Sequence, residues 1–304
     1  MTFTHAAAAH NDAPFFQQLA QAGWVPQALL HLAEHVWQAR QQAQAALPDP
    51  VLPALATAEA HAAGAPLLPR ENFPVDTALA ERLFASLTDI CAAQEDLRGT
   101  TQKLRAFLSE ATFSPQDAFS AFVAENDAPF AAWAERAPEA PQLLYFLTAN
   151  SLAPQLARIG AAVLPAHTVE LWTHGHCPVC GSPVLMGELA KGGASRNPGN
   201  EINKGGQRIH ACSFCSVTFR AKRLQCPYCL EENAEKQRFF TVPAVPDVQV
   251  HVCDNCQSYC KLADFRERYD RFFRPELDDL DTLPLDLAAQ QAGYHRLAPT
   301  VWGL

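Results

Sequence analysis

Residues 177–180 read CPVC, residues 212–215 read CSFC, residues 226–229 read CPYC and residues 253–256 read CDNC. These four Cys-x-x-Cys pairs hold eight of the ten cysteines in the chain. A Cys-x-x-Cys turn places two thiolates on one side of a tight backbone bend, and two such turns brought face to face make a tetrahedral cage of four sulfur atoms. The fourfold spacing therefore predicts two metal sites within residues 174–260.

The order of the pairs along the chain predicts which of them meet. Joining the first pair to the second and the third to the fourth gives two local ribbons, in line with the preference for short, untangled connections. A crossed pairing would intertwine the ribbons and stays open from the sequence. Four sulfur ligands suit zinc and iron alike, and zinc is the commoner structural occupant. The expected ligands are Cys177, Cys180, Cys212 and Cys215 in the first site, and Cys226, Cys229, Cys253 and Cys256 in the second.

Length, charge and cysteine use limit the class of protein. A chain of 304 residues has room for two or three domains, and its formal net charge of −9 disfavours binding to nucleic acid or to an anionic membrane. Residues 1–13 lack the basic start and apolar run of a signal peptide, and residues 143–164, interrupted by Pro154 and Arg158, predict a packed helix pair and no membrane insertion. We therefore expect a cytoplasmic protein, in which reduced thiols favour metal over disulfides.

Composition changes near residue 170. Residues 1–174 contain four glycines and one cysteine, whereas residues 175–304 contain ten glycines and nine cysteines. The first part is rich in residues that favour helix. The predicted fold is a multidomain α+β protein: a disordered N-terminus at residues 1–13, an all-α helical domain at 14–170, a first rubredoxin-like or zinc-ribbon domain at 171–223, a second at 224–262, and a C-terminal helix and tail at 263–304.

Apolar spacing locates helices in the first part, where we expect six to eight. One helical pattern begins near Val25, and another follows Asp76 and carries Cys91 on its apolar face as a buried thiol. Ser114 begins a further helix, with proline at its first position. Pro154 is expected to end one helix and start the next. In the tail, helical spacing is shared by Phe265, Tyr269, Phe272 and Phe273.

Several residues near the cysteine pairs have more than one interpretation. His174 and His176 directly precede Cys177, but four cysteines already fill each cage, so we interpret both as surface residues of the turn. Cys260 is a spare buried thiol or, less simply, a substitute ligand. Residues 187–206 are glycine-rich and predict a flexible loop. The seven Lys and Arg residues within 191–223 form a solvated face or a basic surface for an acidic partner.

The segments GGQRIHACSFCSVTFRAKRLQCPYC, VHVCDNCQSYCKLADF and LDDLDTLPLDLAAQQAGYHR resemble the formate dehydrogenase accessory proteins of the FdhE type. The resemblance is specific from about Cys177 to Arg296 and covers all eight paired cysteines, while Phe219 departs from the larger aromatic residue expected there. It implies a cytoplasmic protein that is needed to mature respiratory formate dehydrogenase and that contacts the catalytic subunit of that enzyme. It also implies a rubredoxin-like C-terminal part with bound iron, so iron is the favoured metal and zinc the alternative.

No catalytic constellation is visible in the sequence. No Gly-rich phosphate loop follows a strand, and a full cage of four sulfur ligands leaves no open position for a substrate. We therefore expect a maturation chaperone and not an enzyme. The alternative is a redox-active, rubredoxin-like protein for electron transfer or oxygen sensing. A third interpretation, a zinc-ribbon nucleic-acid binder, depends only on the basic stretch.

Overall fold

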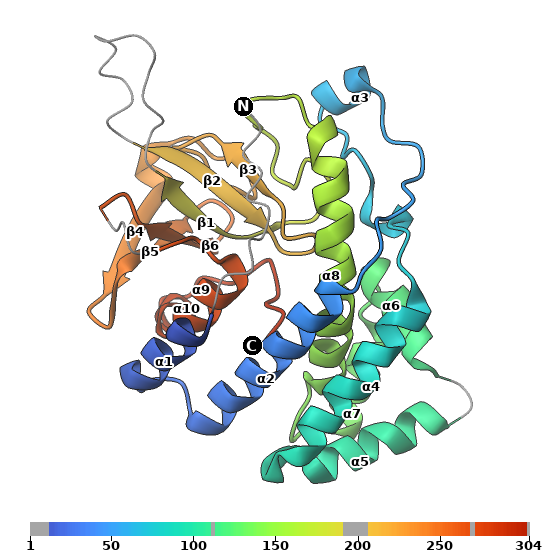
Figure 1. The fold of residues 1–304 in the computed structure, drawn as a ribbon. Helices are drawn as coiled ribbons and strands as arrows, with labels where there is room; N and C mark the ends of the chain where they lie inside the picture. The colour runs from blue at the N-terminus through green and yellow to red at the C-terminus, as the bar shows by residue number, and fades with distance from the viewer. Residues whose placement is uncertain (1–11, 111–112, 191–205, 268–270, 303–304) are drawn as a thin grey trace. The chain divides into compact units, whose positions relative to one another are not determined.

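The computed structural model describes residues 12–110, 113–190, 206–267 and 271–302. They form two compact units (Figure 1). A helical unit contains the described parts of residues 1–51, 73–165 and 301–304, and a sheet unit contains residues 52–72 and the described parts of residues 166–300. The predicted disorder of residues 1–13 falls almost wholly outside the described residues, and the first helix begins at Ala13.

The described part of the helical unit contains seven α-helices, within the six to eight expected. The predicted helix start at Ser114 is confirmed, because its hydroxyl accepts the backbone N–H of Asp117 while the carboxylate of Asp117 accepts the N–H of Ser114. Cys91 is fully buried, as predicted. The helices are α1 (Ala13–Ala22), α2 (Gln27–Ala45), α4 (Thr77–Ala93), α5 (Glu95–Ser109), α6 (Pro115–Val123), α7 (Ala128–Arg136) and α8 (Leu143–Val163).

Helix α8 contacts α2, α4 and α6 and forms the centre of this unit. The prediction that Pro154 would split it was wrong, because the helix continues through the proline. A proline removes one backbone donor and normally disrupts a helix. Here α8 is buried around most of its circumference. One turn earlier, Asn150 donates to the carbonyls of Phe146 and Val301 and accepts from Arg40. The burial of the helix and these contacts compensate for the backbone hydrogen bond that the proline removes.

The sheet unit is built on six strands in the order β3-β2-β1-β6-β5-β4. Strands β1–β3 form one antiparallel ribbon and β4–β6 a second. The two ribbons are not separate domains in the structure, because β1 and β6 pair in parallel and join them into one sheet, with Gly187 opposite Leu262. The strands are β1 (Val184–Ala190), β2 (Gln207–Cys212), β3 (Thr218–Ala221), β4 (Gln237–Val242), β5 (Val245–Cys253) and β6 (Ser258–Asp264).

Two sequence expectations at the ends of these strands need correction. The loop expected at residues 187–206 begins inside β1, and its residues 191–205 lie outside the described part of the chain. The helix expected from Phe265 onward is not found in the described residues, since β6 extends to Asp264 and the next helix begins only at Pro275. Proline is favoured at the first position of a helix, where no backbone donor is needed.

Two short helices, α9 (Pro275–Asp281) and α10 (Leu283–Gln291), pack on the sheet against β1 and β5 (Figure 1). A buried ion cluster fixes them to β6. Nζ of Lys261 lies 2.8 Å from the carboxylate of Asp279 and 2.5 Å from that of Asp286. The guanidinium of Arg296 reaches the same two carboxylates at 2.6 and 2.9 Å. Two cations thus face two anions, which is the balance that buried charges require.

Replacement of Gly187 should destabilise the sheet unit. A Cβ at this position in β1 would lie 2.9 Å from the ring of His210, from the carbonyl oxygen of Ile209 and from the side chain of Leu262. We expect Gly187→Ala to lower the free energy of unfolding by about 1–3 kcal/mol, the usual effect of overpacking. Gly99→Ala is the matched control, since a Cβ there meets nothing within 4 Å. Urea unfolding that gives equal midpoints for both variants would contradict this explanation.

The carboxyl group of Glu188 should make stability depend on pH. Burial, together with the charge of Asp278, raises the pKa of Glu188 from 4.5 to about 7. The folded protein therefore holds this proton more tightly than the unfolded chain, and stability is lost as pH rises from about 4.5 to 7. We expect Glu188→Gln to be nearly neutral at pH 5 and to stabilise by about 2 kcal/mol at pH 8. Glu235→Gln, at an exposed position, should have little effect at either pH in the same thermal unfolding experiment.

Candidate metal centres

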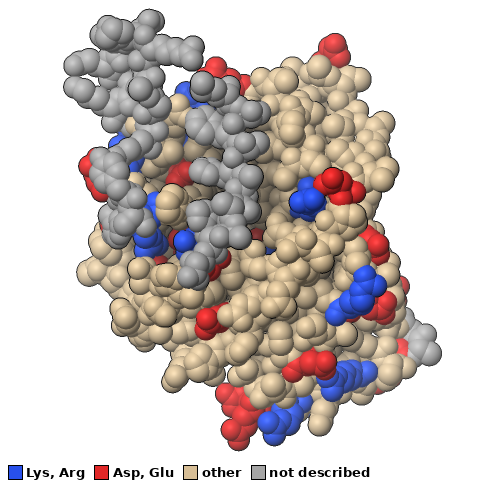
Figure 2. All heavy atoms as spheres, in the orientation of Figure 1, with Lys and Arg blue, Asp and Glu red and all other residues tan. Residues whose placement is uncertain are grey.

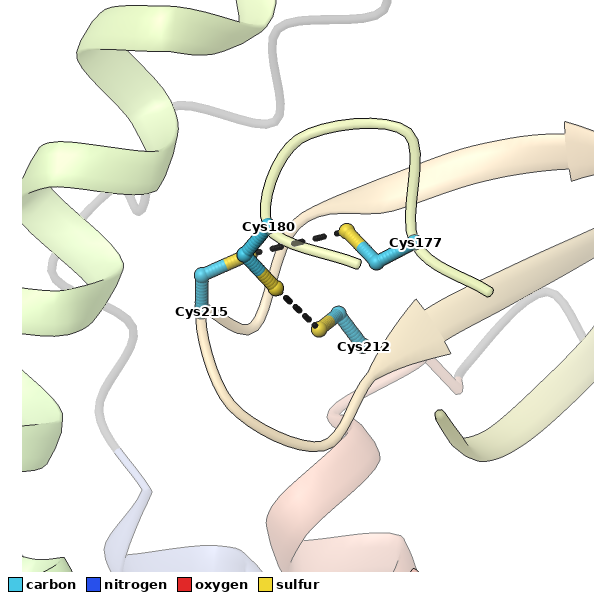
Figure 3. Close-up of side chains that lie close together, drawn as sticks. All are labelled: Cys177, Cys180, Cys212 and Cys215. Atoms are coloured by element: carbon cyan, nitrogen blue, oxygen red, sulfur yellow. Dashed lines mark hydrogen bonds between the residues drawn. The ribbon is translucent and has the colours of Figure 1, made fainter. Parts of the chain in front are cut away.

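The structure brings the first and second Cys-x-x-Cys pairs together in one group (Figure 3). All four sulfur atoms lie within 4.8 Å of one another. Sγ of Cys177 is 3.7 Å from Sγ of Cys215, and Sγ of Cys180 is 3.4 Å from Sγ of Cys212. A tetrahedral site with metal–sulfur bonds of about 2.3 Å has sulfur–sulfur edges of about 3.8 Å. This group, the first cage, could therefore hold one metal ion with little rearrangement.

The third and fourth pairs form a second group with similar dimensions. Sγ of Cys226 is 3.7 Å from Sγ of Cys256, and Sγ of Cys229 is 3.6 Å from Sγ of Cys253. This second cage could hold another ion. The local pairing of the four turns, and not the crossed one, is the arrangement found in the structure.

One backbone turn is repeated at all four pairs. The residue after each second cysteine has a positive φ, of 84° at Gly181, 55° at Ser216, 64° at Leu230 and 56° at Gln257. At three of the turns this residue donates its N–H to the carbonyl of the first cysteine, at 2.8–3.2 Å. Only the first turn has glycine at this position, so three non-glycine residues adopt a left-handed backbone conformation that normally costs about 1–2 kcal/mol. Such strain persists only where surrounding interactions impose it.

The two cages differ in exposure. All four cysteines of the first cage are at most 2% exposed, whereas Cys229 of the second is exposed and Cys256 is partly exposed. Burial raises the pKa of Cys177 and Cys215 well above the usual value. Partial burial would also raise the pKa of Cys229, but hydrogen bonds from Asn255 and from the backbone of Glu231 lower it to about 7. A metal ion in the first cage is thus better shielded from water.

The second cage is attached to the first ribbon at two points. Tyr228, between Cys226 and Cys229, donates its hydroxyl to the carbonyl of Val184 at the start of β1, at 3.1 Å. Arg208 on β2 donates from Nη1 to the carbonyls of Arg223 and Gln225, both at 3.1 Å, just before Cys226. These contacts and the β1–β6 pairing hold the two ribbons together.

Residues 52–72 cover the first cage, which the sequence did not reveal. This segment contains α3 (Ala58–Ala62) and a 3-10 turn at Arg70–Asn72. The backbone N–H groups of Leu67, Leu68 and Arg70 donate to the carbonyls of the first turn, those of Pro178, Val179 and Cys180. The guanidinium of Arg70 also lies 4.1 Å from the centre of the Phe214 ring in the second turn. The segment thus belongs with the metal-binding sheet and not with the helices that flank it in sequence.

His174 and His176 lie outside both cysteine groups. They surround Trp172, whose ring centre is 4.7 Å from that of His174 and 5.7 Å from that of His176. His61 stacks on the same indole at 4.9 Å, and its Nε2 lies 2.8 Å from Nδ1 of His167. The two histidines are partly buried members of an aromatic cluster, so the interpretation as plain surface residues was incomplete.

The remaining cysteines are buried and belong to neither cage. Cys260 lies on β6, and burial raises the pKa of its thiol. Burial likewise raises the pKa of Cys91 to about 12. Both are therefore inert thiols under ordinary conditions, in agreement with the preferred sequence interpretation.

Of the basic surface suggested for residues 191–223, Lys191, Arg196 and Lys204 lie outside the described residues, and three of the four described members are buried or paired. Arg208 is 2% exposed. Arg220 pairs with Glu170 at 2.5 Å, and Lys222 pairs with Glu232 at 2.6 Å. On the face drawn in Figure 2, Lys and Arg side chains over the helical unit likewise stand beside Asp and Glu. The sequence could not show this, because these partners lie up to 50 residues away.

The second cage should release its metal ion before the first. With excess chelator, we expect two phases of one ion each, and a second-cage rate at least about tenfold faster, the scale on which outer-shell protection changes metal binding. Cys229→Ser should remove the fast phase and leave the slow one, while Cys91→Ala should change neither. A single phase that releases two ions would contradict the inferred asymmetry.

Comparisons with known proteins agree on one family. The model of the FdhE C-terminal domain matches residues 211–302. A curated FdhE homolog of Pseudomonas putida is 33% identical over 145 residues, which cover 45% of this chain and 42% of the relative. That of Aquifex aeolicus is 28% identical over 161 residues, covering 53% and 52%. These matches span about half the length of the curated relatives or less.

The crystal structure of the FdhE protein from Pseudomonas aeruginosa has the same fold, with a TM-score of 0.61 at 20% identity over 95% of this chain and 94% of that one. Within the described residues no helix is long and apolar enough to cross a membrane. The chain is thus similar to FdhE proteins in sequence over its C-terminal part and in fold over nearly its whole length.

Proposed function

We propose that this protein is a cytoplasmic accessory factor for the maturation of respiratory formate dehydrogenase. The match of residues 211–302 to the FdhE C-terminal domain and the similarity to curated FdhE homologs support this role. The observation that carries it is the pair of four-cysteine cages on one sheet. A cage with four sulfur ligands leaves no open position at which a substrate could bind the metal, so it suits a scaffold and not a catalyst.

The eight paired cysteines hold two metal ions in this proposal, and iron is the favoured metal, with zinc possible. The sulfur–sulfur distances of 3.4–3.7 Å fit either ion. Each ion would tie the end of one strand to the turn next to another strand, since Cys212 ends β2 and Cys253 ends β5. Metal binding of this kind supplies folding free energy directly.

The partner in this proposal is the catalytic subunit of formate dehydrogenase, and the second ribbon supplies the contact surface. Leu224 is 69% exposed, Leu230 38% and Phe239 64%. Leu224 and Leu230 stand on either side of the Cys226–Cys229 turn in sequence. Large apolar side chains at the surface are typical of the buried centre of an interface. The second cage would hold this turn rigid for docking.

The interface can be tested by complementation in a host that lacks its own copy of the gene. We expect the wild-type chain to restore respiratory formate oxidation and to co-purify with the catalytic subunit. Leu224→Asp should lower co-purification at least about tenfold, the effect of losing one central interface residue, and should keep two metal ions bound.

Leu287→Asp is the matched control, because Leu287 is 61% exposed on α10 of the same unit. It should behave like the wild type. Normal formate oxidation in the strain without the gene would contradict the accessory role itself. Equal co-purification of the two variants would contradict only the proposed surface.

A further inference from the structure

The two edges of the sheet differ in how far they are covered. At one edge, Trp172 forms a bridge with Ala221 and donates its backbone N–H to the carbonyl of Arg220 at 3.0 Å, so it covers part of the outer side of β3. Strand β4 forms the other edge (Figure 1). Among the described residues, no strand or isolated bridge pairs with the outer side of β4. Such an edge presents its backbone donors and acceptors to another chain.

The register of β4 with β5 shows which backbone groups of β4 point outward. Asp254, just after β5, donates its N–H to the carbonyl of Lys236, just before β4, at 2.8 Å. The ladder continues in the same register as far as Phe240. Because only every second residue of an antiparallel strand bonds to the same neighbour, Phe240 bonds to β5, and the backbone groups of Phe239 and Thr241 point away from it.

These outward groups are accessible to another chain. No described residue outside the sheet forms a backbone hydrogen bond with Phe239 or Thr241. Thr241 is exposed, and Phe239 is 64% exposed. The strand contains no proline, and its sequence QRFFTV is rich in aromatic and β-branched residues, which favour strands. The outer edge of β4 therefore has the properties of a template for one more strand.

The side chains beside this edge favour an uncharged, apolar segment. Phe239 stacks on His251, with ring centres 5.7 Å apart and an angle of 22° between the rings. This contact holds the ring in place and leaves much of it for contact with another chain. Arg238 is already paired with Asp254 at 2.8 Å. Recognition would therefore depend on the backbone groups and on apolar contact with Phe239.

We propose that the outer edge of β4 binds an extended, apolar segment of a partner polypeptide, which adds a seventh strand to the sheet through the backbone groups of Phe239 and Thr241. Strand addition of this kind obtains affinity from main-chain hydrogen bonds and specificity from alternate side chains. The inference rests on the proposed function, because the catalytic subunit of formate dehydrogenase supplies the segment. A second copy of this chain fits less well, since each copy carries a formal net charge of −9 and like charges oppose association.

Amide hydrogen exchange at single-residue resolution tests the inference, with the full chain measured alone and in complex with the purified catalytic subunit. We expect the amides of Phe239 and Thr241 to exchange rapidly in the chain alone. In the complex they should exchange about tenfold more slowly, the effect of gaining a backbone hydrogen bond. The amide of Phe240, which already bonds to β5, is the internal control and should change much less.

A proline at position 241 tests the same contact by binding. Thr241→Pro removes an outward N–H and leaves the hydrogen bonds between β4 and β5 in place. It should keep the midpoint of thermal unfolding and weaken binding of the catalytic subunit by about fivefold or more. Thr241→Val is the matched control, because it keeps both the N–H and a branched side chain, and it should bind like the wild type.

A complex in which Phe239 and Thr241 exchange as fast as in the chain alone would overturn strand addition and leave the accessory role intact, even if Thr241→Pro failed to fold. Protection of these amides that grows with the concentration of the chain alone would overturn the inference in favour of a second copy. The absence of any complex would contradict the proposed partner, and this inference with it.

Discussion

Four sulfur atoms within 4.8 Å of one another, twice over, are the constraint on which the sheet unit depends. Thiols this close cannot all ionise without a cation between them, and burial of the first group makes ionisation still harder. A metal ion in each group would remove this conflict and convert four turns of the chain into two fixed points. The positive φ values at Ser216, Leu230 and Gln257 fit this view, because non-glycine residues hold that conformation only where surrounding bonds impose it.

The first and second cages lie on one sheet but have different surroundings. The first is covered by residues 52–72, which bind its turn through three backbone hydrogen bonds, while the second keeps Cys229 exposed. Parallel pairing of β1 with β6 and the contacts of Tyr228 and Arg208 join the two rigidly. One centre is therefore suited to stability and the other to contact with solvent or a partner, although both have the same ligands.

The sequence could predict what local spacing determines. The four Cys-x-x-Cys turns, the capping box at Ser114 and the amphipathic face that carries Cys91 all depend on neighbours a few residues apart. It could not predict features that depend on distant partners. The β1–β6 pairing joins residues about 75 positions apart, and Pro154 stays within α8 because of contacts with other segments. Residues 52–72 look like a connector until their hydrogen bonds to residues 178–180 are known.

The buried cations of the sheet unit differ in whether they are paired with carboxylates. Lys261 and Arg296 are matched by Asp279 and Asp286, so this cluster is neutral and complete by itself. Arg208 is also buried but pairs with no carboxylate among the described residues, and the ionisable groups that act most on it are the thiols of Cys260 and Cys226 and the phenol of Tyr228. A metal–thiolate cage beside it would supply the opposite charge that a buried cation needs. The packing of β2 around Arg208 would then depend on metal loading of the second cage.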